Sequence, residues 1–281
     1  MEIISDKAAM AIRCDAVRRE GKTIAFVPTM GYLHQGHLTL LKEGRNLCDY
    51  LVLSIFVNPT QFGPNEDLDA YPRDGERDMK VAREAGVDTI FTPSNEIMYG
   101  PNYQTYVTLE NLPHHLCGLS RPVHFRGVAT VVTKLFNIVQ PHVALFGEKD
   151  FQQLAVIRQL VADLDFSIKI QGVATVRESD GLAMSSRNAY LTPEQRKNAV
   201  VLYKSLNQAQ EQVAGGEKDA SIVMEKAKAT ILSMPGAEID YIRLCDPQTL
   251  DDVAAITGPT LMALAVKVGQ TRLIDNKVLE P

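Results

Sequence analysis

The stretch that decides the fold is F-V-P-T-M-G-Y-L-H-Q-G-H, which extends from Phe26 to His37. An apolar run over residues 23–27 leads into it and predicts a buried strand, and a helix-like pattern, H-L-T-L-L-K-E-G-R, opens at His37. A strand that passes through a glycine-containing loop into a helix N-terminus is the usual architecture for binding a phosphate. The first N–H groups of such a helix are unpaired, and its dipole favours negative charge. The stretch therefore predicts a nucleotide site.

Two histidines, His34 and His37, flank Gly36 within this stretch. At a spacing of three residues, both rings can point at the same anion as hydrogen-bond donors. Gly36 lacks a Cβ, so a base or a phosphate can approach its backbone closely. The H-x-G-H pattern is therefore typical of a site that transfers a nucleotidyl group. The alternatives are two surface histidines at a turn and a zinc site, although no Cys, Asp or Glu lies close by in sequence to complete a zinc ligand set.

The composition excludes several classes of protein. The chain has 281 residues, of which 45% are apolar, enough for an ample core and for two domains. A net charge of −5 argues against a non-specific nucleic-acid binder. The four cysteines are scattered without a C-x-x-C pair, which suits reduced thiols. No apolar run has membrane-spanning length, and the N-terminus lacks a signal-peptide core. We expect a cytoplasmic protein with small-molecule substrates, no nucleic-acid partner and no membrane segment.

Apolar strands alternate with amphipathic helices over most of the chain. We expect a first helix capped by Ser5 and ending near residue 20, then strands over residues 23–27, 51–57, 87–92, 143–146 and 167–176, separated by helices over 37–47, 74–85, 125–139 and 151–164. This alternation predicts a parallel sheet covered on both faces, and right-handed crossovers make it a Rossmann-like, doubly wound α/β domain. Residues 1–176 are expected to form this domain, which would bind its ligands at the carboxyl ends of the strands. The G-x-G-x-x-G fingerprint of dinucleotide dehydrogenases is missing.

The pattern changes after about Val176. A polar loop, R-E-S-D-G-L-A-M-S-S-R-N, precedes a long predicted helix over residues 193–213 and a second helix over 220–232. Strands over 238–244, 261–268 and 271–274 come last. We expect residues 177–281 to form a smaller α+β domain that closes over the nucleotide site.

Polar side chains follow two further strands. Asn58 and Gln61 lie in S-I-F-V-N-P-T-Q-F, and their amides suit a substrate that carries hydroxyls as well as a carboxylate. Lys149 and Asp150 lie in F-G-E-K-D-F-Q-Q, where the ammonium suits phosphate and the carboxylate suits ribose hydroxyls. Gln153 follows on the first turn of the next helix. Each segment alone would also fit a plain turn or a solvated loop.

The polar loop that opens the C-terminal portion carries M-S-S-R, from Met184 to Arg187. Two hydroxyls and a guanidinium can bind polyphosphate oxygens, and Arg187 offers bidentate contacts. Gly181 could serve as the hinge of a loop that closes on the substrate and excludes water. The alternative is a polar linker between two domains.

Taken together, these motifs resemble those of a known family. H-Q-G-H followed by M-S-S-R resembles the two signature motifs of the class I aminoacyl-tRNA synthetase and nucleotidyltransferase superfamily. Within it the chain resembles the pantoate–β-alanine ligases through P-T-M-G-Y-L-H-Q-G-H, F-V-N-P-T-Q-F, L-D-A-Y-P-R, H-F-R-G-V-A-T-V-V-T-K-L-F, F-G-E-K-D-F-Q-Q-L and D-G-L-A-M-S-S-R-N. These motifs extend from about residue 26 to residue 191 and are specific as a set. Arg187 stands where many synthetases of the superfamily have a lysine. The pantoate–β-alanine ligases resemble this chain at that position.

The resemblance implies an activity and its residues. The activity is ATP-dependent condensation of (R)-pantoate with β-alanine through a pantoyl adenylate, with Mg²⁺ accompanying ATP, in a homodimer. The implied catalytic residues are His34, His37, Lys149 and Arg187, and the metal ligands are unassigned. Pantoate binding is implied at Asn58, Gln61 and Gln153, and β-alanine binding at Gln61. ATP binding is implied at Met30, Gly31, Tyr32, Leu33, His34, Gln35, Gly36, His37, Gly147, Glu148, Lys149, Asp150, Val176, Met184, Ser185, Ser186 and Arg187.

Two other functions stay open, and a third is disfavoured. A nucleotidyltransferase could join CTP or ATP to a phosphorylated alcohol, although the amides of Asn58, Gln61 and Gln153 suit a hydroxy acid better than a phosphate. A nucleotide sensor would not need two histidines, a lysine and an arginine together. A tRNA synthetase would need an anticodon-binding module, for which the small C-terminal portion leaves no room.

Overall fold

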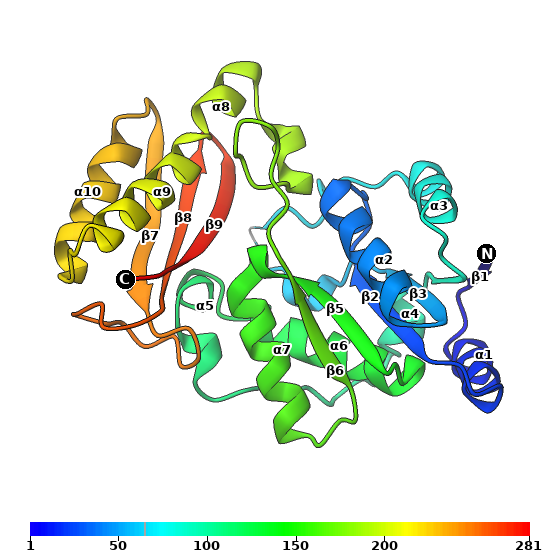
Figure 1. Ribbon diagram of the computed structural model, residues 1–281. Helices are drawn as coiled ribbons and strands as arrows, with labels where there is room; N and C mark the ends of the chain where they lie inside the picture. The colour runs from blue at the N-terminus through cyan, green and yellow to red at the C-terminus, as the bar shows by residue number, and fades with distance from the viewer. Residues whose placement is uncertain (65) are drawn as a thin grey trace. The chain divides into compact units, whose positions relative to one another are not determined.

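The computed structural model describes residues 1–64 and 66–281, which divide into two compact units (Figure 1). The first unit comprises Met1–Glu110, Arg121–Glu148 and Gln153–Ala174. The second comprises Asn111–Ser120, Lys149–Gln152 and Thr175–Pro281. Two short segments that interrupt the first unit in sequence therefore belong to the second. Among the described residues, no helix is both long enough and apolar enough to cross a membrane.

Six parallel strands form the sheet of the first unit, in the order β1-β4-β3-β2-β5-β6. They are β1 (Glu2–Ile4), β2 (Ile24–Thr29), β3 (Tyr50–Ile55), β4 (Thr89–Phe91), β5 (Val143–Gly147) and β6 (Lys169–Val173). From β2 the chain builds outward in one direction through β3 and β4, and then in the other through β5 and β6. This reversal confirms the predicted Rossmann-like, doubly wound sheet. It also places the expected ligand crevice at the carboxyl ends of β2 and β5.

Helices cover both faces of this sheet because alternate residues of each strand point to opposite faces. Ile24 and Phe26 of β2 pack in one core with α1 (Lys7–Arg19), α6 (His124–Val139) and α7 (Phe151–Asp163). Ala25 and Val27 pack in another core with α2 (Gln35–Leu47) and α3 (Gly75–Glu84). Shorter elements are α4 (Asn95–Met98) and the 3-10 turns η1 (Pro59–Gln61) and η3 (Glu148–Asp150).

Some expectations for the first unit are wrong in detail. The first helix is capped by Asp6, whose side chain accepts from the backbone N–H of Ala9, and Ser5 is not the cap. Ser5 is preceded by β1, which at three residues is too short to show any alternation in the sequence. The helix after β2 begins at Gln35 and not at His37, because His34 itself is the N-cap.

The second unit is a three-stranded antiparallel sheet with helices, as the predicted α+β character requires. Its strands are β7 (Ala237–Cys245), β8 (Thr260–Val268) and β9 (Thr271–Leu279), in that order. Its helices are α8 (Pro193–Asn198), α9 (Val201–Ala214) and α10 (Ala220–Leu232), and it also holds α5 (Cys117–Ser120) and the 3-10 turns η2 (Leu112–His114) and η4 (Ser186–Tyr190).

Two predictions for the second unit need correction. The single helix expected over residues 193–213 is interrupted between α8 and α9, where Ala199 and Val200 have ψ of −19° and the N–H of Leu202 bonds to the carbonyl of Ala199, a 3-10 geometry. Strand β9 continues to Leu279 beyond the predicted end at residue 274. Its polar run, Asp275–Lys277, hid the strand because these side chains have partners that the sequence does not reveal.

Candidate functional site

The turn between β2 and α2 has a fixed and unusual shape. Gly31 has φ 84° and Tyr32 has φ 51°, both in the left-handed region. A Cβ on Gly31 would lie 2.9 Å from Asp78 Oδ2 and 3.0 Å from Ile55 Cγ2, so the chain has room only for glycine there. The backbone conformation of the turn that leads into α2 is therefore restricted by close packing.

Asp78, on α3, anchors this turn. Its side chain is 2% exposed, and its two carboxylate oxygens each accept a backbone N–H at 2.7 Å, one from Tyr32 and one from Leu33. Burial raises the pKa of the Asp78 carboxyl above its ordinary value, and the two N–H donors oppose that rise. Sequence reasoning missed this residue. The available signal was an acidic side chain at a core-facing position of an otherwise amphipathic helix.

His34 and His37 hold each other at the start of α2. His34 Nδ1 accepts the N–H of Gly36 at 3.1 Å, and His37 Nδ1 accepts the N–H of His34 at 3.2 Å, so the two rings form a reciprocal capping box. Their ring centroids are 4.1 Å apart. A ring nitrogen that accepts an N–H carries no proton, so each neutral ring is protonated at Nε2. Both histidines are therefore Nε2–H donors at a helix end that favours anions.

Gly36 serves the histidine pair directly. A Cβ at this position would lie 2.8 Å from His34 Cε1 and 3.0 Å from His34 Nδ1. The glycine therefore leaves room for the ring of His34, in addition to the close approach of a ligand that the sequence suggests.

Asn58 and Gln61 lie together after β3. Asn58 is 1% exposed, and its amide nitrogen donates to Gln61 Oε1 at 3.0 Å and to the carbonyl of Gly127 at 3.1 Å. Its Oδ1 accepts from the hydroxyl of Tyr99 at 2.7 Å. Burial raises the pKa of Tyr99 to about 12, so this hydroxyl keeps its proton at neutral pH and acts as the donor. The orientation of the Asn58 amide is thereby fixed.

This network also fixes the orientation of Gln61. Because Oε1 of Gln61 accepts from Asn58, its amide nitrogen is directed elsewhere and lies 3.2 Å from Met30 Sδ. The structure therefore brings Gln61 beside the residue that precedes the turn into α2. It presents Gln61 as a donor, which suits a carboxylate or hydroxyl oxygen.

Three further predicted residues of the first unit lie at the end of β5 or after it. Gly147 ends this strand and Glu148 opens η3, and Gln153 lies half-buried on α7. Because β2 and β5 are parallel neighbours, residues that follow both strands share one edge of the sheet. The sequence predicts that these residues lie at the end of a strand, and the observed strand order puts that strand beside β2.

The second unit carries the two predicted cations. The side chain of Lys149 is 18% exposed, with Nζ 3.7 Å from Asp150 Oδ1. Arg187 lies in η4, and its backbone N–H bonds to Ser185 Oγ at 3.3 Å. The N–H of Met184 bonds to the carbonyl of Val176 at 2.9 Å, so these two predicted residues lie side by side. Asp150 lies in the η3 turn that leads into α7, and Ser186 is buried.

Gly181 lies in a hairpin that is held by backbone hydrogen bonds and by packing against Tyr203. The N–H of Glu178 bonds to the carbonyl of Leu182, and the N–H of Gly181 bonds to the carbonyl of Glu178. Gly181 has φ 98°, and a Cβ there would lie 2.1 Å from the ring of Tyr203. In this structure the glycine serves the turn of a packed hairpin, and it is not placed as the hinge of a loose loop.

Comparisons with known proteins agree on one family. The family model of pantoate-beta-alanine ligase matches residues 2–278. Pantothenate synthetase of Desulfatibacillum aliphaticivorans is 82% identical over 281 residues, covering 100% of both chains. That of Geobacter sulfurreducens is 56% identical over 279 residues, covering 99% of each. Pantothenate synthetase from Thermus thermophilus superposes with a TM-score of 0.95 at 44% identity over 100% of both chains. Pantoate-beta-alanine ligase from Francisella tularensis, complexed with beta-gamma ATP and beta-alanine, superposes with a TM-score of 0.83 at 33% identity. The match covers 99% of this chain and 97% of the Francisella chain.

Proposed function

The chain belongs to the pantoate–β-alanine ligase family, and we propose that it condenses (R)-pantoate with β-alanine to pantothenate while ATP becomes AMP and pyrophosphate. The observation that carries this proposal is the reciprocal cap of His34 and His37 at the start of α2, where the strand order reverses. The ATP derivative and β-alanine named for the Francisella relative are ligands of the kind that this reaction uses.

In the first step the carboxylate of pantoate, which is ionised at neutral pH, attacks the α-phosphorus of ATP. A bond forms between the carboxylate oxygen and phosphorus, and the bond to the β-phosphate oxygen breaks, so that pyrophosphate leaves with the electron pair. His34 and His37 donate Nε2–H groups to the oxygens that gain charge. Lys149 and Arg187, which the second unit carries, neutralise the β- and γ-phosphates. Positioning and charge stabilisation dominate such a step.

In the second step the neutral amine of β-alanine attacks the carbonyl carbon of pantoyl adenylate. The amide bond forms, the bond to the phosphate oxygen breaks, and AMP leaves. The amine loses its proton to water, and no side chain is assigned as its base. Gln61 binds pantoate through its amide nitrogen, because Asn58 already occupies its oxygen, and β-alanine enters beside it. Asn58 thus acts on pantoate chiefly by orienting Gln61, and Gln153 completes the pantoate contacts.

Mg²⁺ enters this proposal with the nucleotide. Within residues 1–64 and 66–281, no three His, Cys, Asp or Glu side chains gather into a group that could hold a metal ion. Mg²⁺ is commonly held by substrate phosphates and water with one or two carboxylates. We therefore propose that the phosphates of ATP are its main ligands, and that it lowers the charge of the leaving pyrophosphate.

The test is isotope exchange between pyrophosphate and ATP with (R)-pantoate as the only other substrate. We expect pantoate-dependent exchange without β-alanine, and its loss when EDTA removes the divalent cation. CTP and other hydroxy acids serve as controls and should give no exchange. If ADP or a nucleotidylated alcohol appears in place of exchange, the adenylate mechanism is wrong. Exchange that persists in EDTA would remove Mg²⁺ from the proposal.

We also propose a homodimer that forms through the edge strand β6. Among the described residues, β6 pairs with β5 alone, and a sheet edge presents unpaired N–H and C=O groups to a partner. Beside this strand lies an open groove of about 480 Å³ whose apolar lining is Val161, Ala162, Phe166, Ile168 and Ile170.

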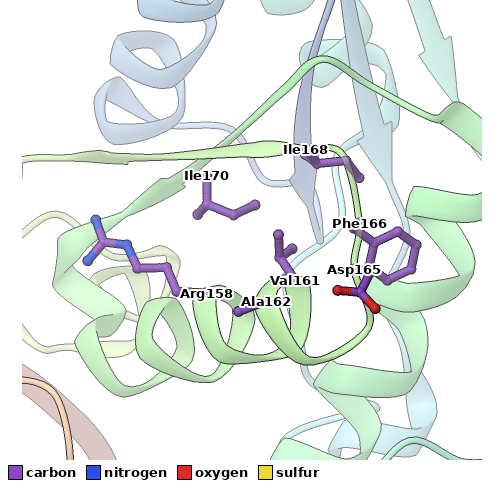
Figure 2. A pocket seen from close by; sticks show the side chains of 7 residues that line it. All are labelled: Arg158, Val161, Ala162, Asp165, Phe166, Ile168 and Ile170. Carbon is purple, nitrogen blue, oxygen red and sulfur yellow. The ribbon is translucent and has the colours of Figure 1, made fainter.

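The ends of the groove carry opposite charges. Figure 2 shows Arg158 at one end and Asp165 at the other. A two-fold axis through the groove would bring Arg158 of each copy toward Asp165 of the other, and would pair the two β6 strands antiparallel. This self-complementarity commits the groove to a second copy of the chain.

Ile170→Asp is expected to convert the dimer to a monomer, because it places a charge in the middle of the apolar groove. Light scattering after size-exclusion chromatography measures the mass. Ile12→Asp on α1, at a position that is 71% exposed, is the matched control and should leave the mass unchanged. Arg158→Asp should weaken the dimer, and adding Asp165→Arg should restore it. A monomeric wild-type protein, or an unchanged mass for Ile170→Asp, would contradict this interface.

A further inference from the structure

Two consecutive residues of β9, Asp275 and Asn276, contact the two segments that carry the cations. Asn276 Nδ2 donates to the backbone carbonyl of Lys149 at 2.8 Å. Asp275 binds Arg177, at the start of the polar loop that leads to Arg187. All of these residues belong to the second unit. Neither β9 residue lies in any of the motifs that point to the activity.

The contact from Asp275 is a buried, two-point ion pair. Asp275 is 3% exposed, and its carboxylate accepts from Arg177 Nη1 at 2.6 Å and from Nη2 at 2.9 Å. Arg177 also donates to the carbonyl of Gly181 at 3.1 Å and lies over the ring of Tyr203 at 4.2 Å. Paired charges with this geometry hold the hairpin of the polar loop to β9.

The contact from Asn276 joins β9 to a short segment that lies in η3 and the first turn of α7. Lys149 to Gln152 is a four-residue stretch of the second unit between two portions of the first. At its other end Gln152 donates to the carbonyls of Leu112 and His115. Asn276 therefore bonds to the end of this stretch that carries the lysine.

The geometry of a strand links these two contacts, because they come from adjacent residues of β9. Successive side chains of a strand point to opposite faces, so Asp275 and Asn276 reach opposite ways from adjacent Cα atoms. Since β9 is paired along its whole length with β8, its backbone is a rigid support. We propose that Asn276 is a positioning residue that sets the backbone of Lys149 through this support, while Asp275 anchors the loop of Arg187 to the same strand. This inference rests on the proposed function, which assigns both cations to the phosphates of ATP.

A positioned ammonium is worth more to catalysis than a mobile one. Oriented charges need no reorganisation when the transition state forms, and misplacement of a reacting group by about 1 Å can cost up to roughly 10² in rate. Loss of the Asn276 bond leaves the lysine present but removes one restraint on the position of its backbone carbonyl. We expect kcat/KM for ATP to fall roughly tenfold in Asn276→Ala, with KM for β-alanine unchanged.

The decisive test is a double-mutant cycle with Lys149→Ala. If Asn276 acts through Lys149, Asn276→Ala should lower kcat/KM for ATP in the wild-type background and cause no further loss in the Lys149→Ala background. The proposal would be overturned if Asn276→Ala lowered kcat/KM for ATP equally in both backgrounds, or did not lower it in the wild-type background. Asn276→Ser provides a second variant should the alanine variant fail to fold.

The matched control is Asn207→Ala. Asn207 accepts a hydrogen bond from Lys277, the next residue of β9, and lies in α9, outside both cation segments. This variant should retain wild-type kinetics, and its thermal unfolding measures what the loss of one such bond does to stability alone. Pantoate-dependent exchange by the unaltered enzyme separates the two proposals. If exchange is present and the cycle is additive, the positioning role fails and the proposed function stands.

Discussion

His34→Asn is expected to slow pantoyl adenylate formation by roughly 10²–10³, the usual effect of removing one preorganised donor. It should leave the protein as stable as before, or more so. Asn places its side-chain oxygen near the position of the histidine Nδ1, so it can accept the N–H of Gly36 and keep the cap of α2. Asn is among the most favourable N-cap residues. The variant lacks only the Nε2–H donor. We therefore expect the rate of adenylate formation to fall while the stability of the fold does not.

The measurement pairs exchange kinetics with thermal unfolding. His37→Ala serves for comparison, because it removes the acceptor for the N–H of His34 as well as the donor, and so should lose both rate and stability. His114→Asn, at an exposed position in η2, controls for the substitution itself. Near-normal turnover in His34→Asn would reject the donor role. A parallel fall in stability would instead mean that the cap fails and that the rate loss is indirect.

The sequence predicts which residues follow strands far better than it predicts what holds them. H-Q-G-H, Asn58 and Gly147 could be assigned to the carboxyl edge of a parallel sheet, because strand and helix periods are local properties. Their supports are remote in sequence. Asp78 lies 45 residues from Leu33, to whose N–H it is bonded, and Tyr99 lies 41 residues from Asn58.

The same limit explains the errors in the second unit. A polar run ends an apolar pattern, so Asp275–Lys277 concealed the last part of β9 although each side chain has a partner. The short segments at 111–120 and 149–152 carry no periodicity that would assign them to the second unit. Such contacts are fixed by tertiary structure, and one sequence contains no local signal for them.

Gly127→Ala is expected to damage both stability and pantoate binding, although alanine is the better helix former by about 1 kcal/mol. Gly127 lies in α6 against the backbone of η1. A Cβ there would lie 2.4 Å from the carbonyl oxygen of Thr60 and 2.5 Å from the backbone nitrogen of Gln61. Backbone cannot rotate away as a side chain can, so α6 and η1 must move apart. Overpacking of this kind costs typically about 1–3 kcal/mol of unfolding free energy.

The separation would also displace Gln61. The carbonyl of Gly127 accepts from Asn58, and Asn58 in turn orients Gln61, so one displacement disturbs the whole amide network. We expect KM for pantoate to rise roughly tenfold or more, consistent with the loss of a bond to a charged substrate, while KM for ATP changes little.

Gly75→Ala is the matched control for Gly127→Ala, because it is also a helical glycine but nothing lies within 4 Å of its ideal Cβ. It should be neutral or slightly stabilising in chemical denaturation. Unchanged pantoate binding in a destabilised Gly127→Ala protein would mean that Gln61 moves together with η1 and that its amide keeps its orientation toward pantoate. Unchanged stability and binding together would mean that α6 and η1 separate at little cost, and that Gln61 owes its position to Asn58 and Tyr99 rather than to the close approach of the two backbones.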